Sequence, residues 1–479
     1  MSIRRLGPLH GLALAAALLC AAPAAAQDWR ELTRTDLAAA AAVIRDNHPG
    51  MVPQVGDTAF VARFNASLAK AEGRVGSVTD AAGMDAVLRG FAAGLGDDHI
   101  AWAPNDAGPP VKSWAGIMVG QRGRDLVVSV TEPGGPPLDA RLVECDGEPA
   151  QALLLRRLAD HAPNPDIQAQ LTINSIWTLL DDDNPFIARP RTCTFEKDGA
   201  TTRTQLTYRP VTTEDFQRLK AGRKVMGLAG FGVRQVGDAW WIGLQSLNQR
   251  APAVIEAAKA HQAELRAAPL VVIDMRGNGG GSSPYGDQLA AVLLGDTPVS
   301  AVRNRASAGF CPPVWRASKD NRKTLDAYAE RFPEQADAWK AEGRKMDEAL
   351  AAGRALAGKV EGCKVVGYDG PPPPHPLFKG RLVVITDAAC FSSCPLVVQR
   401  LRDLGAVQVG QPTNAPTRYM EVRSVDLPSG RGGFTTLQKA AISSPPMIGP
   451  YTPDIAYPGD ITDTAALEAW VPGAVNKAR

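Results

Sequence analysis

The segment at 382–412 constrains the fold of this chain more than any other stretch. It begins with an apolar run at 382–385 that is short and rich in β-branched residues, which predicts a buried strand. Ser392 and Ser393 follow, and then a helical pattern at 396–404 and a second apolar run at 406–409. Turns from a buried strand into a helix often present a nucleophilic hydroxyl, because the helix N-terminus favours negative charge nearby. Serine is also a preferred helix cap, so an ordinary capped helix remains the alternative.

The length, the net charge and the N-terminal segment indicate the number of domains, the kind of partner and the cellular compartment. The chain has 479 residues and a formal net charge of +2. The length suggests roughly three domains of ~150 residues each, and the near-neutral charge gives no reason to expect nucleic acid as a partner. Arg4 and Arg5 precede an apolar stretch, and small residues end at Ala26, which is typical of a signal peptide at 1–26. We therefore expect a secreted or periplasmic protein, and no later stretch predicts a membrane helix.

Cysteines support this expectation. The chain has seven of them, and removal of 1–26 takes away Cys20 and leaves an even number. An even count in an exported protein favours disulfides over free thiols. The predicted pairs are Cys145–Cys193, Cys311–Cys363 and Cys390–Cys394. The last pair has i, i+4 spacing, which suits the ~5.5–6 Å that disulfides prefer between Cα atoms. A redox role for it is a weaker alternative, because the spacing is not Cys-x-x-Cys.

Two regions of different character follow the signal peptide. Residues 27–110 have apolar side chains at helical spacing and predict a helical region. Residues 111–212 predict short strands between Gly, Pro and Asp turns. The segment at 141–149 reads as a strand, an Asp-Gly turn and a helix start, which resembles part of a PDZ domain, a peptide-binding module. Another small β-rich domain is the alternative, and an insertion at about 157–190 departs from a minimal PDZ domain. The predicted strands are 116–120, 125–130, 141–145, 192–196 and 204–208.

Residues 213–479 alternate strands and helices and predict a mostly parallel sheet covered by helices. The predicted elements are strands at 239–244 and 270–274 and helices at 254–267 and 287–294. A charged, Ala-rich helical insertion lies at about 312–362. The strand at 270–274 leads into a Gly-Asn-Gly-Gly-Gly turn at 277–281, which does not match a phosphate-binding loop. Glycines let backbone N–H groups crowd a substrate and point at one place, as an oxyanion hole requires.

Three motifs now stand in one order along the chain. They are Asp98-His99, then Asp274-Met275-Arg276-Gly277-Asn278-Gly279-Gly280-Gly281, then Ser392-Ser393 followed by Val409-Gly410-Gln411-Pro412-Thr413. With Pro453-Asp454 near the end, they resemble the C-terminal processing (tail-specific) serine peptidase family, nearer to its tricorn-core and interphotoreceptor retinoid-binding protein-like branch. The resemblance covers most of residues 30–470. It implies an α/β, crotonase-like ββα core, a helical N-terminal region and a PDZ-like domain.

The resemblance also implies the site residues. Ser392 matches the nucleophile, with Ser393 as the alternative one position later. The backbone N–H groups of Ser393 and Gly280 match the oxyanion donors, with Gly279 as the alternative for the second. His99 matches the general base of the tricorn-like branch.

The general base is where this chain departs from the processing-peptidase branch. That branch uses a lysine after the nucleophile, and this chain has Thr417-Arg418 there. Arginine stays protonated and is a poor base, so either His99 is the base, as the tricorn-like branch implies, or the enzyme is impaired. The residue that orients His99 stays open between Asp98 and Glu421.

We therefore predict an exported serine endopeptidase that acts on polypeptide substrates. Neither a metal nor a cofactor is implied, and the sequence does not predict an oligomeric state. The alternative is a non-catalytic protein that binds a peptide or an apolar ligand on the same scaffold.

Overall fold

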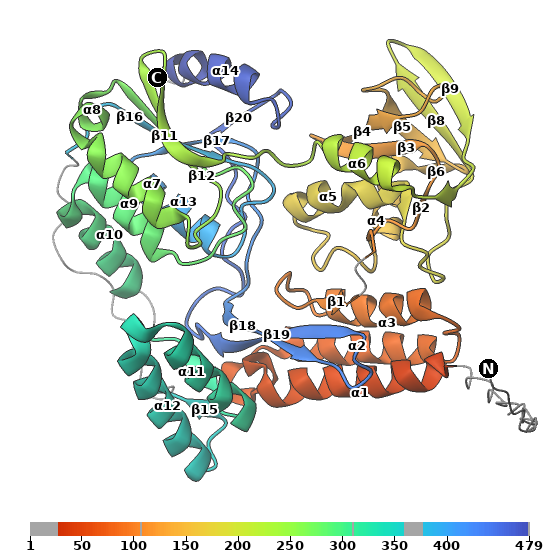
Figure 1. The fold of residues 1–479 in the computed structure, drawn as a ribbon, viewed down its shortest axis with the longest axis horizontal. Helices are drawn as coiled ribbons and strands as arrows, with labels where there is room; N and C mark the ends of the chain where they lie inside the picture. The colour runs from red at the N-terminus through yellow and green to blue at the C-terminus, as the bar shows by residue number, and fades with distance from the viewer. Residues whose placement is uncertain (1–26, 106–107, 309–310, 359–376, 478–479) are drawn as a thin grey trace, which may run out of the picture.

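The computed structural model describes residues 27–105, 108–308, 311–358 and 377–477. The predicted signal peptide at 1–26 and Cys363 lie outside the described residues. Across the described part of the chain, no helix combines the length and the apolar character needed to cross a membrane. Figure 1 shows a helix-covered sheet, a β-rich region beside it, and the N-terminal helices beneath the β-rich region.

A six-stranded sheet forms the centre of the α/β part. Its order is β11–β12–β13–β16–β17–β20, and all neighbours are parallel except the edge pair β11–β12. The strands are β11 (Phe231–Val236), β12 (Ala239–Leu244), β13 (Leu270–Asp274), β16 (Arg381–Thr386), β17 (Val407–Gly410) and β20 (Ile455–Ala456). The apolar runs therefore predicted β12 and β13 correctly, and β16 and β17 to within one residue at each end. A mostly parallel sheet with helical connections is confirmed.

Helices cover both faces of this sheet. One face packs on α7 (Ala251–Ala260), α8 (Gln262–Ala267), α9 (Pro284–Leu294) and α13 (Ser393–Asp403), and the other on α14 (Thr464–Lys477). Successive strand residues point to opposite faces, so Ile242 packs under the first group and Trp241 under α14. The helix predicted at 254–267 is broken at His261, whose φ of −111° and ψ of 22° are not helical.

The N-terminal helices share a hydrophobic core with a later part of the chain. They are α1 (Trp29–Asn47), α2 (Thr58–Val75) and α3 (Ala81–Ala93), and they pack on the hairpin of β18 (Tyr419–Asp426) and β19 (Gly432–Ala440). Phe91 stacks on Phe434 with ring centroids 5.8 Å apart. Strand β19 also pairs with β1 (Trp102–Pro104) and β14 (Val314–Arg316), and β14 pairs with β15 (Leu356–Ala357). This sheet ties the predicted N-terminal region to the insertion helices α11 (Lys319–Arg331) and α12 (Ala336–Ala351).

The β-rich region contains a second six-stranded sheet. Five of its strands follow the order β3–β4–β5–β8–β9, and β6 pairs with β5. They are β3 (Ile117–Arg122), β4 (Asp125–Thr131), β5 (Arg141–Cys145), β6 (Glu148–Pro149), β8 (Thr192–Lys197) and β9 (Ala200–Gln205). The strand predicted at 204–208 is wrong in position. A two-residue turn at Asp198 and Gly199, with φ of 51° and 79°, closes the hairpin earlier and makes 200–205 the strand.

Shorter elements surround this sheet. They are the small sheet of β10 (Arg209–Pro210), β2 (Ser113–Trp114) and β7 (Leu180–Asp181), and the helices α4 (Ala150–Arg157), α5 (Gln168–Asn174) and α6 (Thr213–Ala221). A disulfide joins Cys145 to Cys193 at paired positions of β5 and β8, with Cα atoms 4.0 Å apart. This pair was predicted, whereas the predicted pair Cys311–Cys363 involves a residue outside the described part.

Candidate active site

Ser392 lies between β16 and α13 in a backbone conformation that is unusual for a residue with a side chain. Strand β16 ends at Thr386, and Ser392 caps a helix that begins at Ser393. The φ of Ser392 is 57° and its ψ is −113°. A positive φ at a non-glycine residue costs about 1–3 kcal/mol and persists only where its surroundings enforce it. This sharp turn is the kind that exposes a nucleophile above a sheet.

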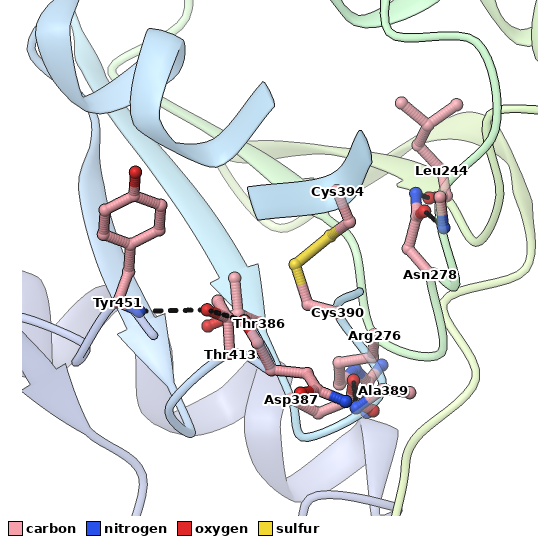
Figure 2. Close-up of a disulfide and its surroundings, with 12 residues drawn as sticks. Leu244, Arg276, Asn278, Thr386, Asp387, Ala389, Cys390, Cys394, Thr413 and Tyr451 are labelled. Atoms are coloured by element: carbon pink, nitrogen blue, oxygen red, sulfur yellow. Dashed lines mark hydrogen bonds between the residues drawn. A yellow bond between two sulfur atoms is a disulfide. The ribbon is translucent and has the colours of Figure 1, made fainter. Parts of the chain in front are cut away.

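A disulfide between Cys390 and Cys394 spans this turn (Figure 2). It is a pair that the sequence predicted, and its Cα atoms lie 5.3 Å apart. The N–H of Cys390 donates to the carbonyl of Asp387 (3.1 Å), and the N–H of Cys394 donates to the carbonyl of Phe391 (3.0 Å). Both cysteines are fully buried. Thiol exchange requires access to a sulfur, so the structure favours a structural over a redox role.

His99 reaches Ser392 from the loop after α3. Its Nε2 lies 3.0 Å from Oγ of Ser392, and its ring packs against that of Phe391 with centroids 4.5 Å apart. Nδ1 lies 2.8 Å from Oδ1 of Asp97. An ionised carboxylate only accepts hydrogen bonds, so this contact places the imidazole proton on Nδ1. Nε2 is then free to accept the hydroxyl proton of Ser392.

Asp97 is buried and remains charged. Burial alone would raise its pKa, but the charge of His99 and hydrogen bonds from His99 and Thr417 outweigh that effect and hold the pKa below its usual value. The Oγ1 of Thr417 donates to Oδ2 of Asp97, and the backbone N–H of His99 donates to Oδ1 (2.8 Å). Asp97 therefore has the contacts of a group that orients and stabilises a protonated imidazole.

The structure corrects the two orienting residues suggested by the sequence. The Oδ2 of Asp98 accepts a hydrogen bond from Nδ2 of Asn414 at 2.7 Å, whereas the ring nitrogen Nδ1 of His99 contacts Asp97. Glu421 lies on β18 beside Lys439 instead. The reason is local: the Asp97 carboxylate accepts the N–H two residues later, a common turn of aspartate, and this brings Oδ1 to Nδ1 of His99. The spacing Asp-x-His permits this contact but does not by itself distinguish Asp97 from Asp98.

The glycine turn packs directly against the Ser392 turn. A Cβ atom added at Gly280 would lie 2.6 Å from Cβ of Ser392 and 2.8 Å from the carbonyl oxygen of Phe391, and φ at Gly280 is 97°. Asn278 fixes the turn, because its Nδ2 donates to the carbonyl of Leu244 (2.7 Å) and its backbone carbonyl accepts from the N–H of Phe391 (3.1 Å). Figure 2 shows Asn278 and Leu244 beside the disulfide.

One of the two N–H groups predicted as oxyanion donors already has an acceptor in the structure. The N–H of Gly280 donates to Oδ1 of Asn278 at 2.8 Å, so it is already engaged. The N–H groups of Gly279 and Ser393 have no recorded acceptor in the described residues. The hydroxyl of Ser393 donates to the carbonyl of Gly281 (2.7 Å) and so ties the two turns together. This contact distinguishes Ser393 from Ser392, which is the serine that contacts His99.

Two buried carboxylates hold the scaffold beneath these turns. Asp387 accepts the N–H groups of Gly227 (2.8 Å), Gly277 (3.0 Å) and Ala389 (3.1 Å) and thereby joins three segments. Burial raises the pKa of Asp387 to about 7 against the effect of these hydrogen bonds. Asp274 forms a buried ion pair with Arg276 at 2.7 Å.

Arg276 links the glycine turn to the C-terminal segment of the chain. Its NH1 donates to the carbonyl of Ile461 (2.7 Å), and its NH2 donates to Oγ1 of Thr464 (3.1 Å) at the start of α14. Arg276 is fully buried and lies away from the reacting groups as part of the support of the glycine turn.

The processing-peptidase branch has a lysine base after the nucleophile, and two cationic side chains that follow Ser392 in that part of this chain have other partners than Ser392. Arg418 has a guanidinium nitrogen 3.5 Å from a carboxylate oxygen of Asp57, and Lys439 lies over the ring of Trp315 at 5.2 Å. Within the described ranges, His99 is the one side chain recorded in hydrogen-bond contact with Oγ of Ser392. The geometry therefore supports His99 as the base.

Comparisons with known proteins bear on the family and the fold of this chain. The model of Peptidase family S41 matches residues 241–448. The solved structure of mature CPAF matches with a TM-score of 0.61 and 13% identity, over 94% of this chain and 98% of that chain. Mature CPAF complexed with lactacystin matches with a TM-score of 0.59 and 13% identity, over 94% of this chain and 100% of that chain. At this identity the likeness to CPAF shows a common fold, and a search of curated proteins found no match.

The family match spans β12, the glycine turn, both disulfide-linked ends of the Ser392 turn and the β18–β19 hairpin. The motifs that suggested the family from sequence lie in this region, except for Asp98-His99 and Pro453-Asp454. Residues 241–448 of this chain therefore match the model of Peptidase family S41, which supports a peptidase of that family.

Proposed function

We propose that this protein is an exported serine endopeptidase that cleaves polypeptides through Ser392, His99 and Asp97. The contact that carries the proposal is the 3.0 Å approach of His99 Nε2 to Ser392 Oγ, with Asp97 at 2.8 Å from Nδ1. A nucleophile, a base and an orienting carboxylate in this order are the working parts of a serine hydrolase.

The reaction follows from the positions of these atoms. Ser392 Oγ attacks the scissile carbonyl carbon while its proton moves to Nε2 of His99, and His99 then gives that proton to the leaving amine. A water molecule next hydrolyses the acyl-enzyme, with His99 again acting as base. Asp97 stabilises the imidazolium in both steps. The N–H groups of Ser393 and Gly279 stabilise the oxyanion, where each such donor contributes about 2.7–4 kcal/mol.

Covalent labelling tests the proposal most directly. A serine-directed phosphonate should label the wild type and the Ser393→Ala variant but not Ser392→Ala or His99→Ala. Ser393→Ala is the matched control, because it removes the neighbouring hydroxyl, which contacts Gly281 rather than His99. A wild-type protein that is folded but neither labelled nor able to cleave any polypeptide would favour the alternative of a non-catalytic binding protein.

We further propose that 111–212 is a PDZ-like domain on a crotonase-like core at 213–479, and that it binds an extended segment of the substrate by strand addition. Its edge strand β3 is covered, since Ser175 Oγ accepts the N–H of Gln121 at 2.9 Å. The opposite edge strand, β9, has exposed side chains. Strand addition is therefore expected at β9, because an added strand requires a free edge.

Hydrogen exchange tests this assignment. Addition of a long peptide substrate to the inactive Ser392→Ala variant should slow exchange at alternate amides of 200–205 and leave 117–122 unchanged. Unchanged exchange throughout 200–205 at saturating peptide would exclude strand addition at β9.

Export is proposed from the charged and apolar segments at 1–26. The two disulfides in the described residues support it, because disulfides persist mainly in oxidising compartments. Expression of the full chain in a bacterial host should release a mature protein whose first residue is Gln27. Recovery of the uncut chain from the cytoplasm would contradict export.

A further inference from the structure

A cavity of about 300 Å³ opens next to the proposed catalytic residues. It lies where α3 and the following loop meet α5 and the loop that carries Asn414. Most of its exposed lining is apolar, and the larger apolar residues there are Ile100, Trp102, Pro163 and Ile173. The cavity therefore suits the stem of a long side chain.

Most of the charged groups in the wall already have partners of opposite charge. Arg89 forms an ion pair with Asp182. Asp160 lies 2.8 Å from the cationic nitrogens of both Lys70 and Arg74. The Arg89–Asp182 pair is neutral, and the Asp160 cluster carries one net positive charge, so neither Asp182 nor Asp160 is available to hold a cationic group of a substrate.

His161 also lines the cavity and is neutral. Burial, with the nearby charge of Arg89, lowers its pKa well below the usual value, and its ring stacks on Trp177 at 4.7 Å. It adds no charge that would repel a cationic group.

Asp98 differs from the other charged groups of the wall. Its Oδ2 accepts from the neutral amide of Asn414 (2.7 Å), and the described residues provide no ion-pair partner for it. Burial raises its pKa to about 6, with the negative charge of Asp97 adding to the effect and the Asn414 hydrogen bond and His99 opposing it. A carboxylate held in a partly buried wall without a cation is costly, and a cationic occupant would offset that cost.

The position of Asp98 links the cavity to the reacting atoms. Asp98 directly precedes His99, and the N–H of Asn414 donates to the carbonyl of Cys390 (3.0 Å), two residues before Ser392. Two residues of extended chain span at most about 7 Å. A side chain of a substrate residue close to the scissile bond can therefore enter the cavity.

We propose that this cavity receives an arginine or lysine side chain of the substrate and that Asp98 accepts hydrogen bonds from its cationic group. Asn414 positions the carboxylate, because its Oδ1 is itself held by the N–H of Ala415 (2.8 Å). This inference rests on the proposed peptidase function and names the substrate class of that site. Charged hydrogen bonds to a carboxylate are about twice as strong as neutral ones, so the preference should be measurable.

The test compares substrates that differ only in charge. Peptides carrying arginine or its neutral isostere citrulline at each position around the cleaved bond should differ in kcat/KM by about tenfold or more at one position in the wild type, equivalent to ~1.4 kcal/mol. Asp98→Asn should reduce that ratio to near one. Asp166→Asn, which removes an exposed carboxylate from the loop before α5, should keep the wild-type ratio.

Labelling provides a second measurement that does not need a known cleavage sequence. A phosphonate with an amidinophenyl group should label the wild type faster than its uncharged phenyl analogue, and Asp98→Asn should lose this difference. Equal labelling by both reagents in the wild type, or a charge preference that survives in Asp98→Asn, overturns the inference while leaving the peptidase proposal intact. Failure of both reagents and of all peptides would instead overturn the peptidase proposal itself, and this inference with it.

Discussion

Asp97 and His99 form one local unit in which a single carboxylate oxygen accepts both the backbone N–H and the ring Nδ1–H of the histidine, each at 2.8 Å. The second carboxylate oxygen accepts from Thr417, on the segment that leads into β18. The orientation of the imidazole therefore depends on a turn of three residues and on one hydroxyl from the far end of the chain.

Replacement of Asp97 tests this unit. Asp97→Asn should lower kcat by about 10³–10⁴-fold, because an amide can donate to Nδ1 and favour the tautomer that cannot accept the serine proton. Glu421→Gln is the matched control and should keep kcat close to wild type, since Glu421 lies beside Lys439 instead. Steady-state kinetics on one peptide measures both, and a near-normal kcat for Asp97→Asn would show that another group orients His99.

Two adjacent glycines should respond differently to the same added methyl group. Gly280→Ala would place Cβ 2.6 Å from Cβ of Ser392 at a φ of 97°, whereas a Cβ at Gly279 meets nothing within 4 Å. Strain of about 1–3 kcal/mol at the reacting serine corresponds to a loss of roughly 10- to 100-fold in rate. Phosphonate labelling rates of the two variants should differ by at least this factor, and equal rates would mean that the turns do not pack in this way in the active enzyme.

Removal of one disulfide should mainly lower the stability of the fold, and removal of the other should mainly lower the catalytic rate. In the chain-entropy account, the Cys145–Cys193 bond, with a separation of 48, stabilises the fold by about 4 kcal/mol, and the Cys390–Cys394 bond, with a separation of 4, by about 2 kcal/mol. Removal of Cys145–Cys193 by double alanine substitution should therefore cost more in urea unfolding. Removal of Cys390–Cys394 should cost more in kcat, because that bond spans Ser392. The reverse ranking in either measurement would contradict this assignment.

Buried His48 should make stability depend on pH below neutrality. Burial lowers its pKa to about 3 against the opposing charges of Asp97 and Asp57, while in the unfolded chain it titrates near ~6.5. As pH falls from ~6.5 to ~3, the unfolded chain binds a proton that the native state does not, so this contribution to stability is lost in that window. Between pH 7 and pH 5 the loss amounts to about 2 kcal/mol.

A single substitution isolates the effect of this histidine from other titrating groups. In His48→Asn the amide oxygen can still accept the N–H of Gly50, which Nδ1 of His48 accepts at 3.0 Å. The free energy of unfolding of this variant should fall less steeply between pH 7 and pH 5 than that of the wild type. Parallel pH profiles for the two proteins would show that His48 takes up its proton over the same pH range in the native and the unfolded state.

Local sequence patterns were sufficient to predict several strands of the central sheet and part of the candidate active site. Apolar runs bounded by turns predicted β12 and β13 to the residue, because a buried parallel strand must be apolar on both faces. The family resemblance carried by the glycine turn and the serine turn predicted that these segments meet, and in the structure both follow neighbouring parallel strands at the same edge of the sheet. The strand that follows Asp198 and Gly199 was misplaced, because a tight two-residue turn there makes it begin at residue 200.

By itself, then, the sequence predicted the strand–turn–helix that presents Ser392 and the glycine turn, and the family resemblance added His99. Only the tertiary structure decided three further points: that the β18–β19 hairpin completes the core of the N-terminal helices, that Asp97 rather than Asp98 faces His99, and that the N–H of Gly280 is engaged by Asn278. Each of these depends on contacts between residues distant in the chain or on the direction of one side chain. Neither hydrophobic period nor motif spacing carries that information, because both describe only what neighbouring residues along the chain prefer.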